Sequence, residues 1–421
     1  MKNRKVILAS VFALLCHSAA QAAGLQASFD NASSLGLANA GSAVLAENAT
    51  TVVLNPAGMF NLKEREISLG AISIKRKTKF SDQGSSSGAF SGSGGRRWSD
   101  EEALYNLYAT YAINSDFRFG IGVKQPYKRG GSASQNWVGS AQEQRFEIES
   151  NEVTPAIAYK INNKTSIGGG ANWQHVDMQF QRASSTLTAF SLNQDSIKFK
   201  GSGDGWGWNA GLMHEVNSQF KIGFTYKSRI KYNIDGNMTV SGPTSALLAS
   251  YRNPAYMQFI SPEAWTLSIM NKFNDKLTFV GDASLTKWGS AGTSAFISGS
   301  TQVTLDQSLD VNLKDTYRFA AGLLYAVREN LDLKFGYAFE QSPIQNEQSQ
   351  IASLPEGDIQ WLSLGARVKI LQSTRVDLGA AYSFRNNSKI SNDQRSSNRG
   401  AVNGDFNVNS WIFGLQLSQS F

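Results

Sequence analysis

The stretch LDLKFGYAFE, residues 331–340, alternates between two kinds of side chain along its whole length. Large apolar side chains occupy its odd-numbered positions, and charged or small ones occupy its even-numbered positions. Successive side chains of a β-strand point to opposite faces, so this alternation predicts a strand with one apolar face and one polar or small face. The same pattern recurs in residues 376–384, VDLGAAYSF, and in the carboxyl-terminal residues 411–421, WIFGLQLSQSF.

The amino terminus predicts export. Residues 1–22 combine a basic start, a short apolar run and the cleavage motif Ala20-Gln21-Ala22, so we predict a signal peptide. The only cysteine, Cys16, lies inside it, and no disulfide is expected in the mature chain. Removal of three basic residues lowers the formal charge from +7 to +4, and no basic run suited to nucleic acid follows.

The mature chain has the profile of an outer-membrane β-barrel. Glycine is abundant at 38 residues, proline is rare at 8, and no later segment is apolar enough for a membrane helix. We expect strands near residues 66–80, 103–113, 117–125, 144–160, 165–182, 205–215, 220–234, 263–273, 277–288, 315–326, 331–340, 359–370, 375–386 and 409–421.

These segments predict an all-β fold, a 14-stranded antiparallel transmembrane β-barrel over residues 63–421, in the outer membrane of a Gram-negative cell. An even strand number suits single-chain bacterial barrels, and closure removes exposed sheet edges. The alternative is a soluble protein with an antiparallel sheet, one face of which is exposed to solvent. That alternative does not explain the aromatic residues near many strand ends, which an interfacial girdle requires. A terminal phenylalanine such as Phe421 is typical of such barrels, and we expect the barrel-insertion machinery to recognise it.

Residues 23–62 do not alternate and are rich in small side chains. One interpretation is a loose periplasmic tail, and the other is a hatch that plugs the lumen. Asn55-Pro56-Ala57-Gly58 ends the segment, and its proline forbids both a helix interior and a central strand. We predict a rigid end of the hatch here, with either a gating or a purely structural role.

Several motifs occur in an order that resembles the FadL/TodX family of outer-membrane transporters of hydrophobic compounds. They include Asn55-Pro56-Ala57, residues 204–237 (DGWGWNAGLMHEVNSQFKIGFTYKSRIKYNIDGN) and residues 313–325 (LKDTYRFAAGLLY). The resemblance covers nearly all of the mature chain. It implies capture of hydrophobic molecules at extracellular loops, binding in an internal pocket, and lateral release gated by the hatch.

The predicted strand 165–182 suggests where a ligand binds. One face changes from apolar to polar at Trp173, as expected where a lipid-facing surface leaves the bilayer. The opposite face is small or polar and then becomes apolar at Val176, Met178 and Phe180, before it ends at Arg182. An inward apolar surface that ends in a guanidinium suits an amphiphile with a carboxylate head. The alternative for Arg182 is an ordinary arginine of the lumen or rim.

The resemblance places Arg182 at the position of the family's carboxylate-contacting arginine. The accompanying lysine of the family has its counterpart at Leu309, which weakens the case for fatty acids. Because Arg182 suits a carboxylate head, long-chain fatty acids are still the first predicted substrate class. Neutral aromatic or alkane hydrocarbons are the alternative.

Two predicted external loops, residues 183–202 and 239–261, are unusually apolar, and we expect them to form a capture groove, with closure of the barrel mouth as the alternative. The candidate groove residues are Leu187, Phe190, Leu247, Leu248, Tyr256, Met257 and Phe259.

Two other function classes remain for comparison. A general diffusion porin needs an open polar lumen, which a hatch would block. A lipid hydrolase needs a catalytic constellation, but His175 and His214 lack a recognisable serine or carboxylate partner in the sequence. No spacing predicts a metal site, and we expect a monomer without cofactors whose partners are hydrophobic small molecules and outer-membrane lipids.

Overall fold

The computed structural model describes residues 29–87, 94, 96–132, 137–183, 196–241, 253–293, 297–298, 313–350, 352, 355–386, 388–397 and 399–421. The predicted signal peptide lies outside these residues. The strands are β1 (Arg65–Asp82), β2 (Arg96–Ala112), β3 (Phe117–Lys124), β4 (Lys128–Ser132), β5 (Arg145–Asn162), β6 (Thr165–Ala183), β7 (Ser196–Glu215), β8 (Phe220–Lys227), β9 (Lys231–Ser241), β10 (Asn253–Ile260), β11 (Ala264–Lys272), β12 (Leu277–Thr286), β13 (Gly292–Thr293), β14 (Ile297–Ser298), β15 (Thr316–Arg328), β16 (Leu331–Glu340), β17 (Asp358–Lys369), β18 (Thr374–Asn386), β19 (Ser388–Asp393) and β20 (Ala401–Ser420).

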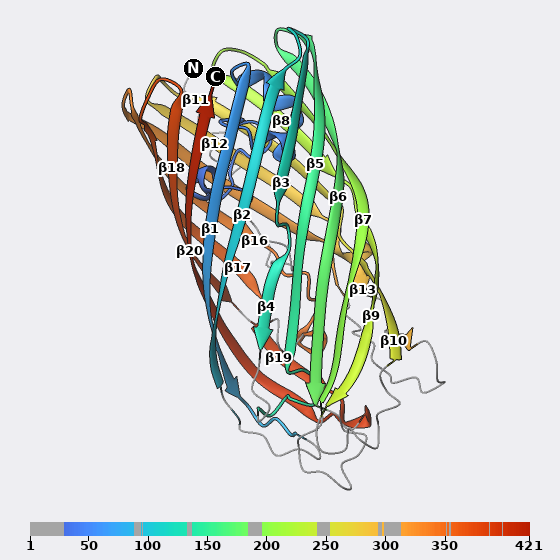
Figure 1. Ribbon diagram of the computed structural model, residues 1–421. Coiled ribbons are helices and arrows are strands. Elements are labelled where there is room, and N and C mark those ends of the chain that lie inside the picture. The colour runs from blue at the N-terminus through green and yellow to red at the C-terminus, as the bar shows by residue number, and fades with distance from the viewer. Residues whose placement is uncertain are drawn as a thin grey trace.

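These strands form one closed antiparallel barrel, which confirms the predicted architecture (Figure 1). β1 pairs with β2 on one side and with β20 on the other, so the last strand closes onto the first. Several crossings consist of two collinear pieces, such as β3 with β4 and β8 with β9. Counted this way, the barrel has fourteen strands, as the sequence predicts.

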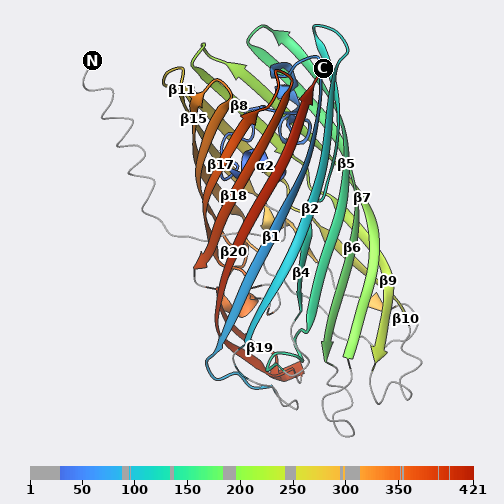
Figure 2. The ribbon, with the colours of Figure 1, turned by 60° about the vertical axis from the view of Figure 1, so that its left-hand side comes forward.

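Large apolar side chains cover the outside of the wall, as the alternation predicts. Leu69, Leu107 and Leu415 are each about half exposed, whereas Gly70, Asn106 and Gln416 point inward in the same register. The short turns and the carboxyl terminus share one end of the barrel (Figures 1 and 2). We refer to this end as periplasmic and to the opposite end, where β9, β10 and β19 lie, as extracellular.

Strands extend further toward the extracellular end than the sequence predicts. β2 begins at Arg96 and β7 at Ser196, although the alternation places their starts near residues 103 and 205. The predicted loop 239–261 is also partly wrong, because β9 continues to Ser241 and β10 begins at Asn253. Outside the membrane the outer face is no longer lipid-facing, so the polarity contrast that identifies a strand disappears.

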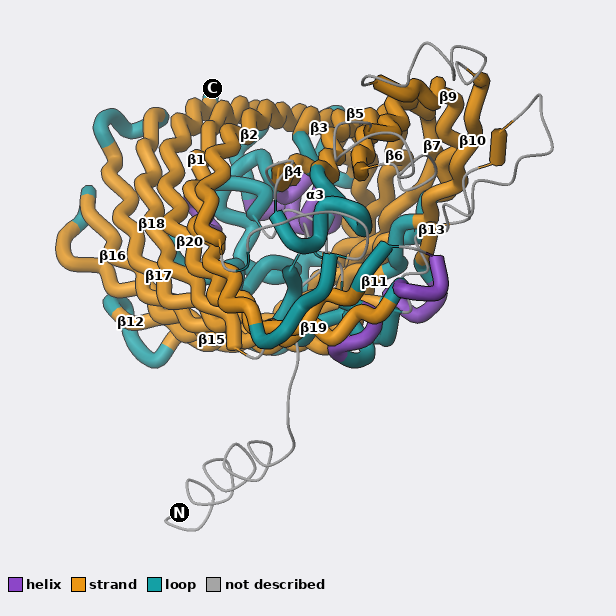
Figure 3. The backbone as a smooth tube through the Cα atoms, turned by 90° about the horizontal axis from the view of Figure 1, so that it is seen from below, coloured by secondary structure: helices purple, strands orange, loops and turns teal. Residues whose placement is uncertain are grey.

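The N-terminal segment, residues 29–64, lies inside the barrel (Figure 3) and near the periplasmic end (Figure 1). It contains two short helices, α2 (Ala32–Leu35) and α3 (Thr51–Leu54), and the 3₁₀ helix η1 (Pro56–Asn61). Leu35, Leu37 and Val44 are fully buried in one apolar cluster with wall residues such as Ile72 and Val280. No helix among the described residues is long and apolar enough to cross a membrane.

Three short 3₁₀ helices, η3 (Trp288–Ser290), η4 (Glu347–Ser349) and η5 (Arg395–Ser397), complete the described elements.

Candidate functional site

An apolar cluster lines the lumen in the extracellular half of the barrel. Its side chains come from β5, β6, β7, β9, β10 and the breaks between collinear strand pieces, and all are buried. We call it the lumenal cluster, and its members are Tyr127, Phe146, Ile148, Val176, Met178, Phe180, Ile197, Phe199, Ile230, Tyr232, Ile234, Met238, Ala255, Met257 and Phe259. A buried, mostly apolar set of inward side chains of this kind suits a hydrophobic ligand.

The predicted faces of strand β6 are correct. Val176, Met178 and Phe180 point inward and belong to the lumenal cluster, and Arg182 follows them on the same face with 5% of its surface exposed. Ala183 donates a backbone hydrogen bond of 2.8 Å to the Ser140 carbonyl, so a turn at residues 137–142 lies beside this end of β6. The geometry brings the four predicted residues together, and their contact with a ligand remains a prediction.

The proposed capture groove is only partly described. Leu187, Phe190, Leu247 and Leu248 lie outside the described residues. The other three candidates belong to strand β10 rather than to a loop, which corrects the predicted placement. Met257 and Phe259 point into the lumenal cluster, whereas Tyr256 is 48% exposed on the outer face, because strand side chains alternate.

Aromatic residues that the sequence argument missed shape the middle of the cluster. The Tyr232 ring stacks on Phe259 with centroids 5.5 Å apart, and Tyr127 meets Phe259 edge-on at 5.8 Å. Tyr127 lies in the break between β3 and β4, next to Pro126, which lacks the N–H of a continuous ladder. The alternation of Tyr232 and Ile234 along the chain could have identified them, because alternate residues of a strand point to the same side and here that side is the lumen.

A buried polar layer adjoins the lumenal cluster. Glu152 is fully buried and accepts a hydrogen bond from Lys227 Nζ at 2.9 Å, and Gln174 also donates to it. Lys124 Nζ lies 3.8 Å from Glu152 and also bonds Asp30 of the N-terminal segment. The layer therefore joins the wall of the lumen to the N-terminal segment.

Asn55 and Pro56 fix the end of the N-terminal segment. Asn55 Oδ1 accepts from the Ala57 N–H at 3.1 Å, so it caps η1, and Pro56 occupies the first helical position, where no N–H is needed. Asn55 Nδ2 donates to the carbonyls of Ala43 at 2.6 Å and of Leu212 in the wall at 3.1 Å. The motif thus ties η1 to another part of the segment and to β7.

Wall glycines let the N-terminal backbone approach the strands closely. A Cβ at Gly336 would lie 2.1 Å from the carbonyl carbon of Leu37, and one at Gly223 would lie 2.0 Å from the Ala43 oxygen. A Cβ at Gly211 would lie 2.0 Å from Asn55 Oδ1. Because real Cβ contacts are never this short, these positions accept only glycine while the segment is docked.

A buried ionic cluster joins the N-terminal segment to the wall. Glu47 accepts hydrogen bonds from Lys334 Nζ at 2.7 Å and from Arg367 Nη1 at 2.5 Å. Asp377 accepts from the same two residues at 3.1 and 3.0 Å, and Ser33 Oγ accepts from Lys334 at 2.7 Å. Burial raises the pKa of the Glu47 carboxyl, but Arg367 and Lys334 outweigh it and lower this pKa to about 2.

The wall is interrupted between β2 and β4. β2 pairs with β3 only from Leu107 to Ala112, and within the described part of the chain no backbone ladder joins residues 96–106 to β4. Single bonds span this gap, from the Tyr105 N–H to Gln125 Oε1 at 3.2 Å and from the Gly130 N–H to Glu102 at 3.4 Å. We call it the wall gap.

The two histidines of the predicted mature chain lie outside the lumenal cluster. His175 is on the outward face of β6, and its Nδ1 lies 2.9 Å from Asp204, a carboxylate partner that the sequence did not reveal. His214 bonds the Thr165 hydroxyl at 2.9 Å near a periplasmic turn.

Comparisons with known proteins agree with this architecture. A family model described as "Outer membrane protein transport protein (OMPP1/FadL/TodX)" matches residues 13–421. The long-chain fatty acid transport protein of Escherichia coli K12 is 24% identical, with 98% of this chain and 97% of the relative covered. Outer membrane protein P1 of Haemophilus influenzae is 25% identical over all of both chains.

Solved structures show the same fold. A Pseudomonas aeruginosa FadL homologue superposes with a TM-score of 0.83 at 18% identity, covering 96% of this chain and all of the other. The toluene transporter TbuX of Ralstonia pickettii superposes with a TM-score of 0.67 at 16% identity, covering 94% and 99%.

Proposed function

Because this chain belongs to the OMPP1/FadL/TodX family of outer-membrane transport proteins, we propose that it takes up long-chain fatty acids through the lumenal cluster. The family consists of transport proteins, and the chain is an outer-membrane transporter of hydrophobic compounds. The observation that carries the fatty-acid proposal is the inward row of β6, where three buried apolar side chains lead to the buried Arg182.

Burial of the hydrocarbon chain supplies most of the affinity in this proposal. Each buried methylene contributes about 0.8 kcal/mol, so ten methylenes give about 8 kcal/mol. That corresponds to about micromolar affinity before the costs of ordering the ligand. Arg182 would then orient the carboxylate and discriminate against neutral molecules, because a charge-assisted bond forms only with an acid.

Within this proposal, residues 23–62 act as the hatch and residues 63–421 as the barrel. The glycine contacts and the ionic cluster support a docked plug, and Asn55, Pro56, Ala57 and Gly58 would be its rigid end. Ala57 accepts a hydrogen bond from the Ser166 hydroxyl at 2.8 Å, so this end is fixed to β6. Substrate-dependent opening would then move the earlier part of the hatch.

A continuous set of polar contacts supports coupling between ligand and hatch. Tyr232 belongs to the lumenal cluster, and its hydroxyl donates to Gln174, which in turn donates to Glu152. Glu152 and Asp30 share Lys124. A ligand that displaces the Tyr232 ring would therefore disturb the bonds that hold Asp30, the first polar residue of the described hatch.

The wall gap supports lateral release. A substrate with a long hydrocarbon chain would leave the lumen directly into the membrane and avoid water, which favours a sideways route. Tyr127 belongs to the lumenal cluster and lies in the strand break that borders the gap. The apolar loops around Leu187, Phe190, Leu247 and Leu248 would capture the substrate first, with Met257 and Phe259 at the entrance to the cluster.

Neutral hydrocarbons are the second candidate substrates. Leu309 stands where the resemblance places a lysine, and the structurally similar TbuX is described as a toluene transporter. In that case Arg182 would not contact the ligand, and only the lumenal cluster would matter.

We expect Arg182→Ala to weaken binding of a long-chain fatty acid about tenfold while binding of a neutral hydrocarbon of similar size changes less than twofold. Loss of one charge-assisted hydrogen bond, taken at the lower end of about 1.5–3 kcal/mol, accounts for this size. The measurement is a titration of the purified protein in detergent with each ligand. Arg395→Ala is the matched control, because that guanidinium is exposed at the extracellular end.

Three results would redirect the assignment. Equal loss for both ligands would remove Arg182 from head-group recognition, and wild-type preference for the hydrocarbon would favour the second candidate. Turnover of a lipid ester that is lost in His175→Ala or His214→Ala would favour a hydrolase instead.

A further inference from the structure

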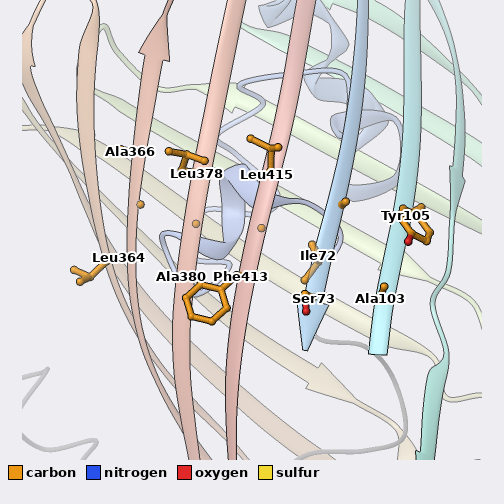
Figure 4. A pocket seen from close by; sticks show the side chains of 14 residues that line it. Ile72, Ser73, Ala103, Tyr105, Leu364, Ala366, Leu378, Ala380, Phe413 and Leu415 are labelled. Atoms are coloured by element: carbon orange, nitrogen blue, oxygen red, sulfur yellow. The ribbon is translucent and has the colours of Figure 1, made fainter. Parts of the chain in front are cut away.

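A hollow of about 730 Å³ lies on the lipid-facing outside of the barrel, across β17, β18, β20, β1 and β2 (Figure 4). Its lining consists of two adjacent rows, and each row runs across the five strands through residues that are ladder partners. Small outward side chains make its floor and large apolar ones its sides, for example Ala71, Ser73 and Ala380 against Leu364, Leu378 and Phe413. Its volume lies within the usual range of about 300–1,000 Å³ for ligand pockets.

Exposed basic side chains lie on two of the same strands, between the hollow and the extracellular end of the barrel. Beyond Ser73, β1 carries Lys75, Lys77 and Lys79 at successive outward positions, and all three are exposed. Lys79 pairs with Arg97 of β2, which is also exposed. We call these four residues the basic patch.

Two aromatic residues place the basic patch at the outer membrane interface. Lys75 pairs with Trp411, which is half exposed on the outer face of β20. Tyr105 of β2, 62% exposed, lies four residues from Glu101, the partner of Lys75 in the ladder. Outward aromatic residues mark the level of lipid head groups, so the patch lies at and beyond that level on the extracellular side.

The basic patch keeps a net positive charge. Glu101 forms an ion pair of 3.6 Å with Lys75. Asp405 of β20, near the end of the patch, bonds Gln83. Among the described residues, no acidic group forms an ion pair with Lys77, Lys79 or Arg97.

The outer face of β7 and β9 differs at the same end of the barrel. There Lys198, Lys200 and Lys231 share the surface with Asp204, Asp235 and, on the neighbouring strand β6, Asp177, so three positive charges face three negative ones. The combination of an apolar hollow with excess cations is therefore a property of the β1–β2 side.

We propose that the hollow and the basic patch together form a binding site for one phosphorylated, multiply acylated lipid of the outer leaflet. The acyl chains fill the hollow, and the phosphate groups contact Lys77, Lys79 and Arg97. Cations at a membrane surface attract anionic head groups, and salt screens this attraction. The site lies on the outside of the wall and shares no residue with the lumenal cluster, so it does not rest on the choice of substrate, although Tyr105 also borders the wall gap.

The test uses the full-length mature protein in a neutral detergent and bis-phosphorylated lipid A as the probe, with binding measured by native mass spectrometry. The triple variant Lys77→Gln/Lys79→Gln/Arg97→Gln should bind the probe at least tenfold more weakly than wild type. Lys198→Gln/Lys200→Gln/Lys231→Gln removes the same number of charges and should change binding less than twofold. Lipid A without phosphates should bind wild type as weakly as the phosphorylated form binds the triple variant.

A second variant tests the hollow separately. Ala380→Trp fills its floor from the lipid side without altering a lumen contact, and it should weaken binding about tenfold at unchanged charge. The proposal is overturned if both triple variants lose equal affinity, if dephosphorylated lipid A binds wild type equally well, or if Ala380→Trp has no effect. A folded barrel in every variant is verified by its heat-modifiable migration on gels.

Discussion

A Gly336→Val variant is expected to displace the N-terminal segment from the lumen. The new Cβ would lie 2.1 Å from the Leu37 carbonyl carbon, and neighbouring backbone atoms lie within 2.5 Å. Overpacking against side chains costs about 1–3 kcal/mol, and here the obstacle is the backbone of the Leu37–Ala38 peptide, which cannot rotate away as a side chain can, so we expect at least the upper value. About 3 kcal/mol shifts the ratio of docked to displaced states about a hundredfold.

The measurement uses a cysteine placed at Val44, which is fully buried in the docked segment. The predicted mature chain contains no other cysteine, so a water-soluble maleimide reports only this site. In the Val44→Cys background, Gly336→Val should raise the labelling rate about a hundredfold. Ionic current through single proteins in a planar bilayer should rise in parallel.

Gly281→Val is the matched control for this variant. It lies on β12, and a Cβ there meets its nearest atom at 3.4 Å, an ordinary contact. Labelling should stay within twofold of the parent. Rapid labelling in the control, or protection of the cysteine in Gly336→Val, would contradict the docking role of Gly336.

The strand β6 shows what the sequence can predict for this fold. The bilayer imposes an apolar outer face, so the change of polarity at Trp173 identifies both the membrane edge and the inward direction of Val176, Met178 and Phe180. The strand number and closure follow from the same repeated pattern. Where the chain leaves the membrane this constraint ends, and the part of β9 beyond residue 234 and all of β10 could not be placed from alternation alone.

The stretch LDLKFGYAFE shows what the sequence could not reveal. Alternation places Lys334 and Gly336 on the inner face but gives no reason for either residue type. The reason is contact with the N-terminal segment, since Lys334 bonds Glu47, which is 287 positions away in the chain. Such partners depend on the register of several strands and on the path of the N-terminal segment, neither of which has a local sequence signal.

The second large effect is expected from Glu47→Gln. This change leaves Lys334 and Arg367 buried against Asp377 alone, so one positive charge loses its compensation. Removing one partner of a buried ionic cluster costs about 3–5 kcal/mol. In the Val44→Cys background we therefore expect labelling to rise at least about a hundredfold at pH 7.

Two comparisons distinguish uncompensated charge from lost packing. Glu101→Gln removes one partner of an exposed ion pair and should leave labelling unchanged. Glu47→Gln combined with Lys334→Met restores neutrality and should recover most of the protection, because Arg367 and Asp377 still pair. A double variant that labels as fast as the single one would show that the charge balance does not hold the segment.

The ionic cluster also predicts how docking depends on pH. The pKa of Glu47 is about 2 when the segment is docked, against 4.5 for an ordinary glutamate. A lowered pKa stabilises the docked state above pH 4.5, and this contribution is lost as the pH falls from 4.5 toward 2, because the released carboxyl binds a proton more tightly. Single-channel current through the wild type should therefore rise over this interval and stay constant between pH 5 and 8. In Glu47→Gln the current should already be high at pH 7 and change little on acidification, whereas an unchanged acid response in that variant would assign the response to another group.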